Sequence, residues 1–236
     1  MNPYQKLQNR KRTWTPVQTT AGELCAGSEE TIYRALAMRH MELPVGSFIQ
    51  DALSEIPALS ADLLRSNVKD EENHDLALGY IANALGVDET AEAEAKRLRD
   101  AWQAHPDHTV LKALVAERAI FFVLLPFFRF NGDAGLRTVS ADISRDEQVH
   151  VAANSLVCRE LGLSISPSLD KLRKATINWV MTPLKSSTNK YLDKKFWLDA
   201  SDRLMYEGKA PELSDTKRAR MPAFFEHANP NLPQYA

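Results

Sequence analysis

Two glutamate–histidine pairs are the residues of this chain best suited to chemistry. Glu71 lies three positions before His74, and Glu147 lies three positions before His150. Residues three apart on a helix project from the same face, so each pair can hold one metal ion from one side. Two such pairs, with one more carboxylate from each of two other helices, form the ligand set of di-metal carboxylate bundles.

Two upstream glutamates supply the remaining carboxylates. Glu117 precedes Glu147 by nearly the same interval as that by which Glu42 precedes Glu71. Two antiparallel helices joined by a turn would bring such positions level. Glu30 competes with Glu42, but its longer distance from Glu71 breaks the repeat, and it resembles a first-turn acid. The predicted metal ligands are therefore Glu42, Glu71, His74, Glu117, Glu147 and His150.

The surroundings of Glu117 favour a metal rather than a solvated face. This glutamate lies in the apolar stretch 114–122, where an unpaired buried carboxylate would be very costly. One glutamate–histidine pair alone is common by chance and is usually a solvent-facing pair. The duplicated pattern instead predicts two bound transition-metal ions, and carboxylates with two imidazoles suit iron or manganese.

Helices must position these residues. Glycine is scarce and β-branched runs with period two are absent, so the sequence predicts an all-α fold. The duplicated ligand pattern makes the expected fold a ferritin-like four-helix bundle with additional helices. We expect an N-terminal extended segment (1–25), a helical domain (26–208) and a flexible C-terminal tail (209–236). Pro44 and Gly46 are expected to kink or interrupt the first helix. The expected helices span 28–41, 57–85, 89–104, 107–130, 134–161, 168–181 and 187–206.

Composition restricts the class of partner and the compartment. The formal net charge of -2 argues against a dominant nucleic-acid or membrane-surface partner. The longest apolar stretch, 119–128, is too short to span a bilayer. The first twelve residues have no apolar signal-peptide core, and neither Cys25 nor Cys158 belongs to a CxxC motif. We therefore expect a cytoplasmic protein with no nucleic-acid and no membrane partner.

The ISRDE-x-x-H run at 143–150, with Glu117 ahead of an Ile/Phe-rich helix, resembles the small, radical-generating subunit of class I ribonucleotide reductase. The resemblance covers about residues 10–160 and a piece of the tail. It implies an oxidised di-metal cluster that generates an oxidising equivalent. That equivalent would pass to a large (alpha) subunit, where ribonucleotides are reduced. It also implies that the chain forms a homodimer.

Three further matches concern the transfer step. Trp14, within an Arg-Thr-Trp-Thr-Pro run, resembles the family's electron-relay tryptophan, and Asp146 matches the aspartate that links a ligand histidine, here His74, to it. Tyr235, after the run Phe224-Phe225-Glu226, resembles the tyrosine that relays the radical across the subunit interface. The alternatives are a packing tryptophan, a surface aspartate and a stray terminal tyrosine.

Two departures from the family pattern bear on the cofactor. Leu78 stands where the usual family member has its radical tyrosine, and Tyr80 points about 200° away from that direction on a helix. Glu42 replaces the usual aspartate. Both changes resemble subclasses in which the cluster itself holds the oxidising equivalent, which favours Mn/Fe over Mn/Mn or Fe/Fe.

Two other functions remain open at this stage. A stand-alone di-metal oxidase or oxygenase would act on a small apolar substrate, with Leu78 opening a pocket beside the metals. A metal-storage or purely structural bundle is disfavoured, because it would need neither Trp14 nor Tyr235.

Overall fold

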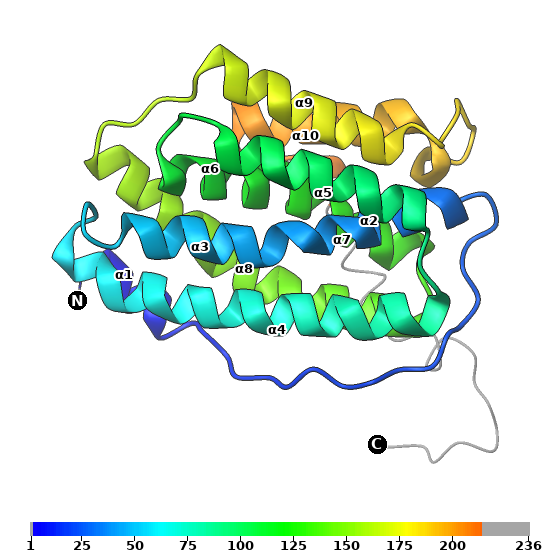
Figure 1. Cartoon of the computed structure of the whole chain (residues 1–236), viewed down its shortest axis with the longest axis horizontal. Coiled ribbons are helices and arrows are strands. Elements are labelled where there is room, and N and C mark those ends of the chain that lie inside the picture. The colour runs from blue at the N-terminus through cyan, green and yellow to red at the C-terminus, as the bar shows by residue number, and fades with distance from the viewer. Residues whose placement is uncertain (1, 214–236) are drawn as a thin grey trace.

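The computed structural model describes residues 2–213, and within them the fold is all-α, as predicted (Figure 1). The only β-structure in this range is an isolated bridge between Lys185 and Asp193. The helices are α1 (Pro3–Gln8), α2 (Glu29–Ala37), α3 (Glu42–Ala52), α4 (Ala61–Leu85), α5 (Glu89–Ala104), α6 (Thr109–Ala116), α7 (Phe122–Asn131), α8 (Ala134–Glu160), α9 (Pro167–Met181) and α10 (Lys194–Glu207).

Four helical segments form the central bundle. Helix α3 packs against α4 and α6, and α8 packs against α4, α6 and α7. A five-residue π-helix, Glu117–Phe121, joins α6 to α7, so these two helices act as one interrupted element. Helices α9 and α10 lie on the side of the bundle opposite α4 (Figure 1). The predicted bundle with additional helices is thus arranged around α3, α4, α6–α7 and α8.

The N-terminal segment crosses the outside of the bundle. Residues 11–25 contain no helix and run past α4 before the chain enters α2 (Figure 1). The backbone N–H of Gly22 donates to Asp133 Oδ2 (2.8 Å), and that of Cys25 donates to the Asn131 carbonyl (2.9 Å). The prediction of an extended segment misses α1, which begins with a proline after an Asn2 cap.

Three helix boundaries differ most from the sequence-based expectation. Helix α4 begins at Ala61, after a 3₁₀ turn at Ala58–Ser60, rather than at Pro57. The helix from 28 does not kink at Pro44 but ends in a 3₁₀ turn, Met38–Met41, and α3 then begins at Glu42. Pro44 therefore lies in the first turn of α3, where a missing N–H breaks no helical hydrogen bond. The last helix begins at Lys194 rather than Ser187, because Asp193 caps it by accepting from the Phe196 N–H (3.2 Å).

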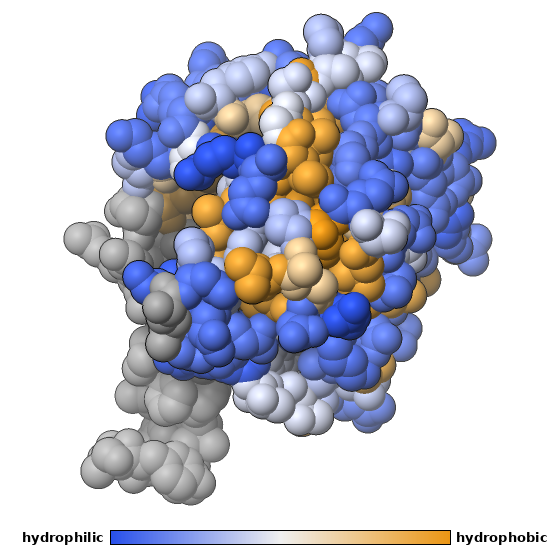
Figure 2. Space-filling model, turned by 90° about the vertical axis from the view of Figure 1, so that its left-hand side faces the viewer, coloured by the Kyte–Doolittle hydropathy of each residue, from blue (hydrophilic) through white to orange (hydrophobic). Residues whose placement is uncertain are grey.

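The apolar side chains form one contiguous core with some exposed apolar surface. Residues Val123–Phe128 of α7 are all buried, which agrees with the aromatic and aliphatic run in that part of the sequence. Figure 2 views the end of the molecule on the left of Figure 1, where apolar surface is ringed by hydrophilic side chains. No helix among residues 2–213 combines the length and apolarity that crossing a membrane would require.

Candidate metal centre

The structure brings the six predicted ligands together in the middle of the bundle. Glu42 begins α3, Glu71 and His74 lie midway along α4, Glu117 begins the π-helix, and Glu147 and His150 lie on α8. All six side chains are buried. Their candidate donor atoms form two groups, each within 4.8 Å: Glu42, Glu71, His74 and Glu147, and then Glu71, Glu117 and His150.

Most of the side-chain atoms that could bind a metal in this cluster have no hydrogen-bond partner. Both carboxylate oxygens of Glu42, Glu71 and Glu147 are buried and unsatisfied, as are Oε1 of Glu117 and Nδ1 of both histidines. Leaving so many buried polar atoms unpaired would cost several kcal/mol, at about 1–3 kcal/mol for each group. Two divalent cations at this position would satisfy these atoms together, so the residues fit a di-metal site.

The distances distinguish bridging from terminal carboxylates. Glu71 Oε2 lies 3.3 Å from His74 Nδ1, whereas Glu71 Oε1 lies 3.0 Å from His150 Nδ1. Glu147 divides its oxygens in the same way, with Oε1 3.5 Å from His74 Nδ1 and Oε2 3.9 Å from His150 Nδ1. Both carboxylates therefore face both histidines, and Glu71, which belongs to both groups of donor atoms, is placed to bridge two ions.

The other two glutamates each face one histidine. Glu42 Oε2 is 3.6 Å from His74 Nδ1, and Glu117 Oε1 is 3.9 Å from His150 Nδ1. Glu42 and Glu117 are therefore placed as terminal ligands of opposite ions. Glu30, the competitor of Glu42 in the sequence, instead pairs with Arg34 on α2 and is exposed.

Each of the two histidines contacts an aspartate through Nε2, the ring nitrogen that faces away from the cluster. His74 Nε2 lies 3.2 Å from Asp146 Oδ2, and His150 Nε2 lies 2.9 Å from Asp70 Oδ2. An N–H on Nε2 that donates to the carboxylate leaves the Nδ1 lone pair facing the cluster, as a ligand requires. Asp146 also accepts a hydrogen bond from Trp14 Nε1 (2.7 Å), and Asp70 forms an ion pair with Lys11.

Three residues that support the cluster were not identified in the sequence, namely Asp70, Lys11 and Asn154. Asp70 immediately precedes Glu71, as Asp146 precedes Glu147, so an Asp-Glu-x-x-His repeat could have revealed it. Lys11 and Asn154 carry no such signal. Asn154 lies about one turn after His150, and its Nδ2 donates to Glu117 Oε2 (2.7 Å), which fixes the orientation of that carboxylate.

The π-helix accounts for the placement of Glu117. Such single-turn bulges widen the helix locally and often occur at functional sites. Arg118, the next residue, donates from Nε to the Leu204 carbonyl (2.8 Å) and so anchors the wide turn to α10. The sequence prediction of one regular helix over 107–130 is wrong at this point.

A cavity of about 200 Å³ between α3 and α4 reaches the centre. Its lining includes Glu71, Val68, Gln50 and Gly46. A Cβ atom at Gly46 would lie 3.5 Å from Glu71 Cβ, so this glycine leaves room beside the bridging carboxylate. Leu78, expected to open such a pocket, does not line this cavity and is buried in the core.

Burial and mutual contact shift the pKa values of the cluster strongly. Burial raises the pKa of Glu42 and of Glu117 well above the usual range, and it also raises the pKa of Glu147. Burial also acts on Glu71, but His150 and His74 outweigh it and lower its pKa. The metal-free centre therefore retains protons at pH values where exposed glutamates have lost them.

The histidines show the same retention of protons. Burial would lower the pKa of His74 and His150, but the surrounding carboxylates outweigh it and raise both pKa values well above the usual range. Groups with raised pKa values stabilise the metal-free fold most at low pH, and this stabilisation is lost as the pH rises through the raised pKa values.

We expect divalent metal binding to become tighter as the pH rises, because each bound ion must displace protons from these side chains. Each displaced proton steepens the affinity by about tenfold per pH unit. Manganese titrations by calorimetry at pH 6 and pH 8, in two buffers that differ in ionisation enthalpy, would count the protons released. An affinity that does not change over this interval would contradict the expectation.

Trp14 and Asp146 lie beside the centre as the resemblance implies, whereas Tyr235 and the run Phe224–Glu226 lie outside the described residues. The Trp14 ring stacks on His74, with centroids 6.2 Å apart and an interplanar angle of 21°. The surface-aspartate alternative is wrong, because Asp146 is buried and contacts both rings, whereas a packing role for Trp14 stays an alternative. Tyr80 is partly buried on α4.

No family model matches the chain, and neither a curated protein nor a solved structure is significantly similar to it. The chemistry of the centre therefore has to follow from its own residues.

Proposed function

We propose that the chain is the small subunit of a class I ribonucleotide reductase with a ferritin-like bundle. Its di-metal centre would generate an oxidising equivalent for a large subunit. The observation that carries the proposal is the unbroken path from His74 through Asp146 to Trp14. A storage or structural site needs no oxidisable side chain in hydrogen-bonded contact with a ligand, so this path favours electron transfer.

The protein's part in this function begins with holding two ions. Glu71 and Glu147, which face both histidines, would lie between them, Glu42 and His74 would complete one position, and Glu117 and His150 would complete the other. The pair of ions, for which we favour Mn/Fe over Mn/Mn or Fe/Fe, would supply a strong one-electron oxidant when bound in an oxidised state. The buried carboxylates would balance the charge of the ions.

Asp146 and Trp14 then move one electron and one proton. Loss of an electron from the Trp14 indole makes its N–H strongly acidic, and Asp146 Oδ2 lies 2.7 Å away to accept that proton. An oxidised metal pair would accept the electron, and the proton would stay on the aspartate. The stacked rings of Trp14 and His74 bring the donor close to a ligand of the centre.

The residue four positions after His74 supports a cluster that stores the oxidising equivalent itself. Leu78 is 3 % exposed and aliphatic, so this position has no side chain that can be oxidised to a stable radical. The oxidising equivalent would accordingly remain on the ions until Trp14 gives up an electron to them.

A second candidate function is a stand-alone di-metal oxidase, which the cavity beside Glu71 favours. With about 200 Å³ and apolar residues such as Leu43 and Val68 in its lining, it suits a small molecule. Such an enzyme would turn over without a large subunit and would not need Trp14 to be oxidised.

Replacing Trp14 with phenylalanine separates these two functions. Phenylalanine keeps an aromatic ring but cannot be oxidised under the same conditions and has no N–H for Asp146. We expect metal content to be unchanged and nucleotide reduction with the matching large subunit to fall by at least about tenfold, which corresponds to ~1.4 kcal/mol or more in the barrier.

Trp179→Phe is the matched control, since Trp179 is also partly buried but stacks with Arg34, away from the metal centre. It should retain full activity. Equal activity of the Trp14→Phe variant and the unaltered protein would contradict the proposal and favour the oxidase.

A further inference from the structure

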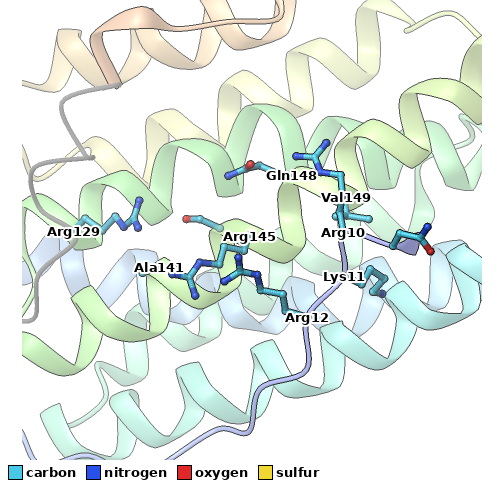
Figure 3. Close-up of a pocket in the computed structure, with 10 residues that line it drawn as sticks. Arg10, Lys11, Arg12, Arg129, Ala141, Arg145, Gln148 and Val149 are labelled. Atoms are coloured by element: carbon cyan, nitrogen blue, oxygen red, sulfur yellow. The ribbon is translucent and has the colours of Figure 1, made fainter. Parts of the chain in front are cut away.

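A cavity of about 550 Å³ lies on the outer side of α8, separate from the cavity that reaches Glu71 (Figure 3). Five cationic side chains contribute to its lining, and none of its lining residues is acidic. The whole chain has 29 basic and 31 acidic residues, so this concentration does not reflect a basic protein. The five cations are Arg10, Lys11, Arg12, Arg129 and Arg145.

The cations come from three separate parts of the chain. Residues 10–12 belong to the N-terminal segment that follows α1, Arg129 lies near the end of α7, and Arg145 lies on α8. In Figure 3 the side chains of Arg12 and Arg145 extend side by side, with Arg10 and Arg129 on opposite sides of them. Like charges are brought together here by the tertiary fold, which costs free energy unless an anion binds between them.

Nearby carboxylates offset only part of this charge. Asp142 pairs with Arg145 at 3.1 Å, and Asp70 pairs with Lys11. Arg10 and Arg12 are exposed, and neither forms an ion pair within residues 2–213. An excess of positive charge therefore faces the cavity, on guanidinium groups whose paired N–H donors match the oxygens of a phosphate.

The shape and the remaining lining favour a compact ligand. Ser144 and Gln148 add polar groups, whereas Ala141 and Val149 are the only apolar side chains in the lining. An acidic peptide would need an extended groove with apolar subsites for its other side chains. A short chain of phosphate groups needs only converging donors in a concave, polar site.

We propose that this cavity binds a compact oligophosphate, such as the triphosphate group of a nucleotide, with Arg10, Arg12 and Arg145 as its donors. The proposal does not depend on the proposed function, because none of these three arginines takes part in the metal centre. It assigns the N-terminal segment a second use, since the residues just before Trp14 would bind the anion.

Calorimetric titration of the metal-loaded protein with tripolyphosphate tests this assignment. We expect saturable binding of one molecule per chain, weakened at least tenfold by Arg12→Gln and likewise by Arg145→Gln. ATP serves as the second probe. Equal affinity would mean that the phosphates are the whole ligand, and tighter binding of ATP would add a contact to the nucleoside.

Arg65→Gln is the matched control for Arg145→Gln. Arg65 pairs with Asp62 three residues earlier on α4, as Arg145 pairs with Asp142 on α8, but it lies outside the cavity. Its loss should leave affinity unchanged. Absence of saturation would overturn the proposal, as would an equal loss in the control. A heat signal that persists in both cavity variants would also overturn it, because extraction of metal by the probe would give such a signal. Saturation by an octaglutamate peptide but not by tripolyphosphate would overturn it as well.

Discussion

Replacing Glu71 with alanine is expected to remove both metal ions from the centre. Its two carboxylate oxygens face different histidines, Oε2 toward His74 and Oε1 toward His150, so its loss takes one ligand from each ion. Glu117→Ala should instead remove one ion, because Glu117 lies only in the group that contains His150. The two variants thus separate a bridging from a terminal role.

Metal analysis after loading with manganese and iron under reducing conditions measures these outcomes. The unaltered chain should hold close to two ions. Glu72→Ala is the matched control, because Glu72 is the next residue on α4 but points to solvent, where it pairs with Lys69. A Glu71→Ala variant that still held two ions would show that this carboxylate does not bridge them, whereas an unaltered chain that bound neither manganese nor iron would contradict the di-metal interpretation.

Replacing Tyr235 with phenylalanine is expected to eliminate nucleotide reduction while leaving the centre intact. Under the proposed function this tyrosine relays the oxidising equivalent across the interface with the large subunit. Phenylalanine keeps the ring but has no phenolic proton to give up, so a proton-coupled transfer through this position would stop. Metal content and oxidation of the centre should match those of the unaltered chain.

The assay combines the variant with the matching large subunit and measures deoxyribonucleotide formation. Tyr206→Phe provides the control, since Tyr206 is a largely exposed tyrosine whose hydroxyl donates to Asp170 on α9. Retained activity in Tyr235→Phe, or in a chain lacking residues 222–236, would remove the relay from the proposal. The stand-alone oxidase would then become the better interpretation.

The residues of the candidate metal centre could be predicted from the sequence because local spacing encodes them. Glu71 with His74 and Glu147 with His150 are neighbours on a helix wherever that helix lies. The nearly equal intervals from Glu42 to Glu71 and from Glu117 to Glu147 further indicate that each pair lies on two antiparallel helices joined by a turn. Strong helical periodicity likewise gave most helix positions, including the full extent of α5 and the end of α4 at Leu85.

Other features depend on contacts between distant segments, and the sequence carried no local signal for them. Lys11 pairs with Asp70 because the N-terminal segment crosses α4, and Arg12 and Arg145 line one cavity because residues 10–12 also lie beside α8. The π-helix at Glu117 also involves a contact that is distant in sequence, because Arg118 donates a hydrogen bond to the Leu204 carbonyl on α10. Helix α1 was missed because six residues give too little periodicity to detect.

The two ligand histidines have matching aspartates but different outer partners, and this asymmetry gives the centre a direction. Behind His74 stands Trp14, which can lose an electron; behind His150 stands Lys11, whose ammonium group has none to give. Under the proposed function, an electron can therefore enter the centre only on the side of His74. In a mixed-metal centre the two positions would then not be equivalent, and activity would depend on which ion occupies the position beside His74.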